Sequence, residues 1–209
     1  MTEPRVKAAR IWFAVMLATA ALVAFAFKHV DLRVLTVVAP YSSHFERLGK
    51  GLASAFLLAF EALVFLELAI PRVVRGTLSP LGKATAVACI SSICAYAINA
   101  SVLKVVFGVL PPWFVLHGIP HAAHFLQGTA DSSFPSGHMA LAGAFAGVLM
   151  RHYAKSILPL AGLLALAGGL LIAGSWHFVS DVVAGTFVGV TAGLLAAEVW
   201  LAHERAQAS

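Results

Sequence analysis

The sequence predicts an all-α membrane protein, a bundle of six transmembrane helices whose N- and C-termini both lie in the cytoplasm. Its composition is the first reason, because 60% of the residues are hydrophobic and 11% are charged, whereas soluble domains carry roughly 25% charged residues. The second reason is that the apolar residues gather in six stretches, and a helix needs about 20 such residues to cross a bilayer. The third is an uneven distribution of Lys and Arg around these stretches.

The predicted helices span residues 11–28, 51–71, 84–107, 136–152, 156–175 and 179–202. They use nearly the whole chain, so residues 1–209 are predicted to form a single integral membrane domain. The first stretch follows Arg5, Lys7 and Arg10, as the apolar part of a signal peptide would. Its length of about 17 residues and the lack of a clear cleavage site favour a retained helix.

Basic residues indicate the orientation of the helices. With a cytoplasmic N-terminus, nine of the 14 Lys and Arg lie inside and five lie outside. The inner set is Arg5, Lys7, Arg10, Arg72, Arg75, Lys83, Arg151, Lys155 and Arg205. This orientation places segment 109–135 and the turn 175–179 on the periplasmic or extracellular side of what would be a bacterial inner membrane. Basic inner loops suit anionic lipid, and no basic tract suggests a nucleic-acid partner.

The run Phe134-Pro135-Ser136-Gly137-His138 lies where the predicted fourth helix begins. Pro is favoured at helix starts, and Ser136 and Gly137 would then leave free backbone N–H groups in the first turn. Such groups bind anions, aided by the positive end of the helix dipole. His138 lies beside this predicted anion site, where it can supply a proton.

His177 and Asp181 are four residues apart at the start of the predicted sixth helix. On a helix this spacing places both side chains on one face. A carboxylate that holds one imidazole nitrogen leaves the other nitrogen free to act as a nucleophile. An anion site, an acid histidine and an oriented nucleophilic histidine together indicate phosphate chemistry, with His138, His177 and Asp181 as catalytic residues.

Glycines at four-residue spacing suggest how the two motifs meet. They are Gly143 and Gly147 in the fourth predicted helix and Gly185, Gly189 and Gly193 in the sixth. Small residues at this spacing let helices pack closely in lipid, which would bring the starts of these two helices together. Glycine is also simply common in membrane helices, and the same residues can pack helices between chains. The oligomeric state is therefore left open.

Several outer residues are candidates for binding a phosphate. Lys104, at the outer end of the third predicted helix, is either a phosphate-binding cation or a lysine that extends its amine to the membrane surface. The 109–133 segment contains His117, His121 and His124. No cysteine accompanies them and their spacing forms no ligand set, so no metal and no other cofactor is predicted. His124 and Gln127 are candidates for binding phosphate or a lipid head group, or else are exposed loop residues.

These residues resemble the signature of the type 2 phosphatidic acid phosphatase family of integral membrane lipid phosphatases. That signature consists of Lys, six residues and Arg-Pro, then Pro-Ser-Gly-His, then Ser-Arg, five residues, His, three residues and Asp. The second part is complete at residues 135–138, and the His–Asp half of the third is complete at His177 and Asp181. Of the first part, Lys104 and Pro112 match.

Both arginines of that signature are missing. They fall on Pro111 and Leu171, and the signature serine falls on Leu170. Arginine binds phosphate through a bidentate, charge-assisted fork, so its loss would weaken phosphate binding. Candidates to replace it are Lys104, the backbone at Ser136, Gly137 and His138, and the side chains of Ser175, His124 and Gln127.

The resemblance implies a metal-independent lipid phosphatase. His177 would form a phosphohistidine, Asp181 would orient His177, and His138 would protonate the leaving group and then activate water. The substrate would be a membrane lipid phosphate or a polyprenyl diphosphate, with phosphatidic acid, phosphatidylglycerol phosphate and lipid A phosphate as examples. The alternatives are a phosphotransferase with the same site and a protein that binds or transports lipid phosphates without turnover. The head group, and the choice between monoester and diphosphate, stay open.

Overall fold

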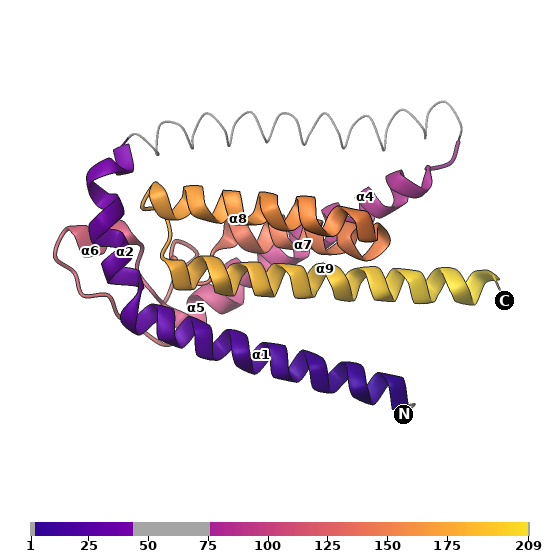
Figure 1. The fold of residues 1–209 in the computed structure, drawn as a ribbon, viewed down its shortest axis with the longest axis horizontal. Helices are drawn as coiled ribbons and strands as arrows, with labels where there is room; N and C mark the ends of the chain where they lie inside the picture. Colours follow the sequence, from indigo (N-terminus) through magenta and orange to yellow (C-terminus); the bar gives the residue numbers. More distant parts are fainter. Residues whose placement is uncertain (1–2, 44–75, 209) are drawn as a thin grey trace.

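The computed structural model describes residues 3–43 and 76–208, which form helices joined by loops with no strand among them (Figure 1). The α-helices are α1 (Glu3–His29), α2 (Asp31–Val38), α4 (Pro80–Ile98), α5 (Lys104–Phe107), α6 (Pro112–Leu116), α7 (Gly137–His152), α8 (Ile157–Ala173) and α9 (Val179–Ala208). Shorter turns are the 3-10 helices η1 (Ala39–Tyr41) and η3 (Ala154–Ser156) and the π-helix η2 (Asn99–Leu103). The all-helical prediction is confirmed for these residues.

Four helical segments of the described residues are long and apolar enough to cross a membrane. They are Ala9–His29, Pro80–Phe107, Ala154–Ala173 and Val179–Gln207, and they correspond to the first, third, fifth and sixth predicted helices. The predicted fourth helix is present as α7, but its 16 residues rise only about 24 Å, short of a hydrocarbon core of about 30 Å. The predicted helix 51–71 lies outside the described residues. The count of six spans and the cytoplasmic termini therefore stay predictions.

Local sequence explains the bounds of α7. Ser136 is its N-cap, and the hydroxyl oxygen of Ser136 accepts a hydrogen bond from the backbone N–H of Met139 at 3.4 Å. At the other end Tyr153 leaves the helical conformation, with φ −128° and ψ 89°. The helix therefore begins within the Pro-Ser-Gly-His run and carries His138 in its first turn.

Glycines let α7 and α9 approach closely, as their spacing predicted. A Cβ atom on Gly143 would lie 3.0 Å from the backbone nitrogen of Val190, and one on Gly189 would collide with the carbonyl oxygen of Ala140. Similar close approaches occur at Gly147, Gly185 and Gly193. Only the absence of side chains permits this backbone contact. Helix α4 packs against both helices.

The starts of α7 and α9 lie at the same end of the bundle as α2 and α6, and the start of α1 and the end of α9 lie at the other (Figure 1). Small residues fill the centre, where Ala88, Val148 and Ala197 join α4, α7 and α9. Large apolar side chains are exposed on the outside, including Phe13, Ile93, Leu158 and Val199. An exposed apolar surface of this kind suits helices that contact lipid.

Candidate active site

The first turn of α7 forms one side of the site. Ser136 is completely buried, and its backbone N–H donates to the backbone carbonyl of Asp181 at 3.0 Å. The prediction that this N–H is free is therefore wrong, because α9 supplies an acceptor that sequence spacing cannot reveal. The next two N–H groups, of Gly137 and His138, form no hydrogen bond with another described residue. They are the groups of this turn that can bind an anion.

Two side chains of α4 and η2 support this turn. The Nδ2 group of Asn99, a fully buried residue, donates to the carbonyl oxygen of Pro135 at 3.0 Å. A Cβ atom on Gly137 would lie 3.1 Å from a ring carbon of Tyr96. Glycine at this position therefore lets the start of α7 lie directly against α4.

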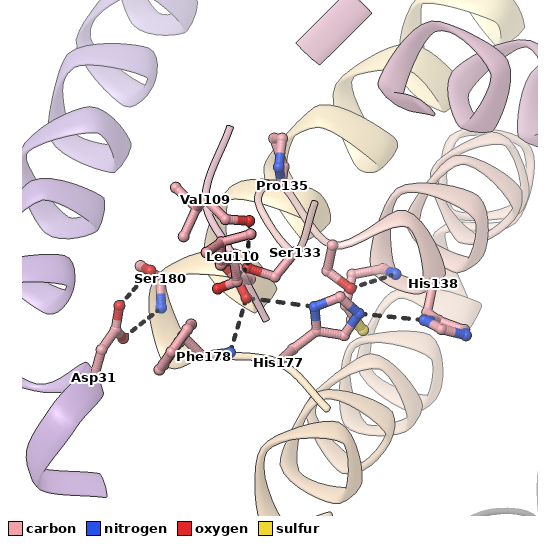
Figure 2. Close-up of polar contacts among 12 residues, drawn as sticks. Asp31, Val109, Leu110, Ser133, Pro135, His138, His177, Phe178 and Ser180 are labelled. Atoms are coloured by element: carbon pink, nitrogen blue, oxygen red, sulfur yellow. Dashed lines mark hydrogen bonds and ion pairs between the residues drawn. The ribbon is translucent and has the colours of Figure 1, made fainter. Parts of the chain in front are cut away.

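His177 contacts both of its predicted catalytic partners, His138 (Figure 2) and Asp181. Its Nε2 atom lies 3.3 Å from Nδ1 of His138, and its Nδ1 atom lies 3.4 Å from Oδ2 of Asp181. Only 8% of His177 and none of Asp181 is exposed, whereas His138 is exposed. The structure thus brings the two motifs together, with the buried histidine held by the carboxylate and the exposed one facing solvent.

These contacts fix the proton positions in the neutral pair. A carboxylate only accepts hydrogen bonds, so Nδ1 of His177 carries the proton and Nε2 carries a lone pair. Nδ1 of His138 must then donate to that Nε2. In this arrangement the nitrogen of His177 that faces His138 is the one that carries the lone pair.

Asp181 is held by the first turn of α9. Its Oδ2 atom also accepts a hydrogen bond from the backbone N–H of Phe178 at 2.9 Å, and a carboxylate is stabilised at a helix N-terminus. Its Oδ1 atom is buried without a hydrogen-bond partner among the described residues. Asp181 thus serves both as a helix cap and as the acceptor for His177.

Lys104 lies at the edge of this group. It is half-buried, its Nζ atom donates to the carbonyl oxygen of Ala130 at 2.9 Å, and it is close enough for its charge to act on Asp181 and His138. Lys104 therefore lies within electrostatic reach of the site, although it forms no hydrogen bond with either histidine. Its role in binding phosphate stays a prediction.

The other predicted binding residues are placed less directly. Ser175 has a positive φ of 55°, and its hydroxyl is buried without a hydrogen-bond partner among the described residues. His124 and Gln127 are exposed, and neither side chain forms a hydrogen bond with another described residue. No hydrogen bond among the described residues joins either side chain to His138 or His177. The binding roles of Ser175, His124 and Gln127 stay predictions.

Three residues near the site were not singled out as functional from the sequence. Asp31 accepts hydrogen bonds from Ser180, and His121 contacts the same carboxylate. A lone carboxylate a few residues after an apolar stretch is a signal that could have pointed to Asp31. Among the described residues, no group of three or more His, Cys, Asp or Glu is arranged to hold a metal ion.

The sequence model of the PAP2 superfamily matches residues 84–205, which is more than half of the chain. The chain belongs to the PAP2 superfamily. The matched range contains both histidine motifs and Lys104 but not Asp31. Superfamily membership and the long apolar helices support a membrane phosphatase in general terms.

Among solved structures, this PAP2 chain is similar to a transmembrane PAP2-type phosphatidylglycerolphosphate phosphatase from Bacillus subtilis. The sequence identity is 21%, the match covers 90% of this chain and 87% of that chain, and the TM-score is 0.37. No curated protein matches the chain.

Leu171 occupies a position where the resemblance places a phosphate-binding arginine, and in this PAP2 chain it makes different contacts. The Leu171 side chain packs in an apolar cluster with Met139 and Leu164. Its carbonyl oxygen accepts hydrogen bonds from the backbone N–H groups of Trp176, at 3.0 Å, and His177, at 3.3 Å. Leu171 therefore supports His177 through its backbone and supplies no charge.

Proposed function

We propose that the chain is a lipid phosphatase that hydrolyses a lipid phosphate at the non-cytoplasmic face of the membrane through a phosphohistidine on His177. The observation that carries this proposal is the continuous His138–His177–Asp181 contact, with distances of 3.3 and 3.4 Å. A protein that only binds lipid phosphate has little physical need for a histidine held by a carboxylate on one side and faced by a second histidine on the other.

The first chemical step transfers the phosphoryl group to the protein. Nε2 of His177 attacks phosphorus with its lone pair, and the bond from phosphorus to the lipid oxygen breaks. Protonated His138 gives a proton to the departing alkoxide, so the lipid leaves as an alcohol. His177 becomes a cation as the bond forms, and the buried carboxylate of Asp181 stabilises that charge.

This step requires His138 to move. In-line transfer places the attacking and leaving atoms on opposite sides of phosphorus, whereas His138 and His177 are in direct contact at 3.3 Å. The phosphoryl group must therefore separate the two rings. His138 is exposed, so its side chain can rotate without disturbing the core, and contacts of this kind often change when substrate binds.

The second step releases inorganic phosphate. His138, now neutral, accepts a proton from water, the water oxygen bonds to phosphorus, and the phosphorus–Nε2 bond breaks. His177 returns to its neutral form and His138 to its protonated form. An alcohol in place of water would convert the same site into a phosphotransferase.

The anion is bound mainly by backbone groups in this proposal. The N–H groups of Gly137 and His138 lie at the start of α7, and Lys104 contributes a positive charge nearby. Pro111 and Leu171 replace the two arginines of the signature. Anion binding therefore relies on the backbone N–H groups and Lys104, which bind phosphate more weakly than arginine does.

The test is phosphate release by the detergent-purified protein from phosphatidic acid, phosphatidylglycerol phosphate, a polyprenyl diphosphate and lipid A phosphate, with EDTA present. The parent is expected to release phosphate from at least one lipid, whereas His177→Ala releases none. His203→Ala, far along α9 and exposed, is the matched control and is expected to behave as the parent. Binding of these lipids without release, and without phosphohistidine in the parent, would overturn the proposal. Transfer to an added alcohol would identify a phosphotransferase instead.

A further inference from the structure

A second buried polar cluster lies directly behind the catalytic residues. Asp31, at the start of α2, is 1% exposed and receives three contacts. Its Oδ1 atom accepts from the backbone N–H of Ser180 at 3.0 Å, and its Oδ2 atom accepts from the hydroxyl of Ser180 at 2.5 Å. Nε2 of His121 lies 3.2 Å from the same Oδ2 atom. Three segments that are distant in the sequence therefore share one carboxylate.

The cluster resembles a nucleophilic triad in composition but not in geometry. In such a triad the serine hydroxyl gives its proton to the histidine, whereas here the hydroxyl of Ser180 donates to Asp31. Ser180 is also completely buried, so no substrate can reach it. The cluster therefore has a different task.

Its contacts reach the short link between the nucleophile and its carboxylate partner. Three residues, 178–180, separate His177 from Asp181. Asp31 holds Ser180, and the ring of His121 packs on the ring of Phe178 with a centroid distance of 4.1 Å. The His121 ring also packs on Phe27 of α1, with a centroid distance of 4.2 Å. Two of the three linking residues are thus fixed from outside α9.

The electrostatics of the cluster also favour holding the start of α9 in place. Ser180 lies in the first turn of α9, where backbone N–H groups have no acceptor within the helix. Asp31 supplies that acceptor from another helix, while Phe178 is bonded by Asp181. Asp31 also lies in the first turn of α2, so its charge faces two helix N-termini. Asp31 and His177 line the same small cavity, of about 10 Å³, which holds at most one water molecule.

We propose that Asp31, with His121, is a positioning residue that fixes the first turn of α9, so that the Asp181 carboxylate stays aimed at Nδ1 of His177. The inference rests on the proposed phosphatase chemistry for its rate effect, but not for its structural effect. Displacing a catalytic group by about 1 Å can lower a rate about 100-fold. Loss of Asp31 should therefore reduce turnover more than it reduces substrate binding.

The kinetic test compares the full-length parent with Asp31→Ala, Asp31→Asn and His121→Ala. Asp31→Ala is expected to lower kcat about 10- to 100-fold while KM changes less than about threefold. Asp31→Asn should retain much of the activity, because its amide oxygen can still accept from the backbone N–H of Ser180. Thr36→Ala, an exposed position on the same helix, is the control and should match the parent.

A spectroscopic readout separates this inference from the proposed function. In protein with ¹⁵N-labelled histidine, the Nδ1 proton of His177 that is bonded to Asp181 should give a far-downfield resonance, assigned by its absence in His177→Ala. Asp31→Ala is expected to shift or broaden it, and Asp31→Asn to preserve it. If the parent shows no turnover, this readout alone decides. An unchanged resonance and kcat in Asp31→Ala, even with lower thermal stability, would overturn the inference. If Asp31→Ala does not fold, His121→Ala, which removes the ring that packs on Phe178 and contacts Asp31, is judged by the same criteria.

Discussion

The backbone N–H of Ser136 donates a hydrogen bond to the backbone carbonyl of Asp181 over 3.0 Å. This bond joins the start of α7 to the first turn of α9 without any side chain. The alignment of the two motifs therefore depends on how closely the helix backbones approach, and Gly185 and Gly189 lie along that contact. The distance between His138 and His177 should respond to changes in helix packing below the site.

Gly189→Ala tests this dependence. The new Cβ atom would collide with the carbonyl oxygen of Ala140, and overpacking of this kind costs about 1–3 kcal/mol. We expect a lower free energy of unfolding in detergent and reduced phosphate release. Gly162→Ala and Gly169→Ala in α8 are matched controls, because open space surrounds a Cβ atom at both positions. Equal destabilisation by all three substitutions would show that the α7–α9 contact is not responsible.

Asp181→Asn isolates the charge of the carboxylate from its geometry. An amide oxygen at the position of Oδ2 can still accept from Phe178 and His177, but it no longer neutralises the cation formed during attack. We expect kcat to fall by at least about 100-fold, as for other residues that assist proton chemistry, with KM close to that of the parent. Steady-state phosphate release measures both values. Glu204→Gln, near the far end of α9, should leave both unchanged.

Lys104→Met tests whether this lysine binds the substrate anion. A hydrogen bond to a charged group contributes about 1.5–3 kcal/mol, so kcat/KM is expected to fall about 10- to 100-fold. Lys104→Arg keeps the charge but changes the shape of the cationic group, so its kcat/KM should lie between those of the parent and Lys104→Met. Lys155→Met, on the exposed η3 turn, is the control. Parent-like kcat/KM in Lys104→Met would favour a lysine that only reaches the membrane surface.

Asn99→Ala tests the support of the Pro-Ser-Gly-His run from η2. The substitution leaves the buried carbonyl of Pro135 without its donor, which costs about 1–3 kcal/mol. We expect a lower melting temperature and a lower rate of phosphate release, because the start of α7 carries the N–H groups that are proposed to bind the anion. Ser101→Ala, two residues away and exposed, should change neither property. Full activity at unchanged stability in Asn99→Ala would contradict this role.

Local patterns in the sequence predicted much of the fold and the core of the site. The lengths of the apolar stretches predicted five helices that are present among the described residues, because burial in lipid demands continuous apolar surface. The four-residue spacing of His177 and Asp181 predicted their contact, and the glycine spacing predicted the packing of α7 on α9. The glycine information lies on one face of each helix, whereas His177 lies two residues before α9 begins at Val179, so its contact with Asp181 forms across the start of the helix and not along a helix face.

The tertiary structure alone decided which polar groups are already satisfied. The Ser136 N–H is occupied by the carbonyl of Asp181, and Asp31 holds Ser180, which is 149 residues away in the chain. His121, an ordinary loop histidine in the sequence, has a buried ring that packs on both Phe27 and Phe178. Such contacts join segments with no shared periodicity, so they exist only once the helices have packed and each buried donor has found its acceptor.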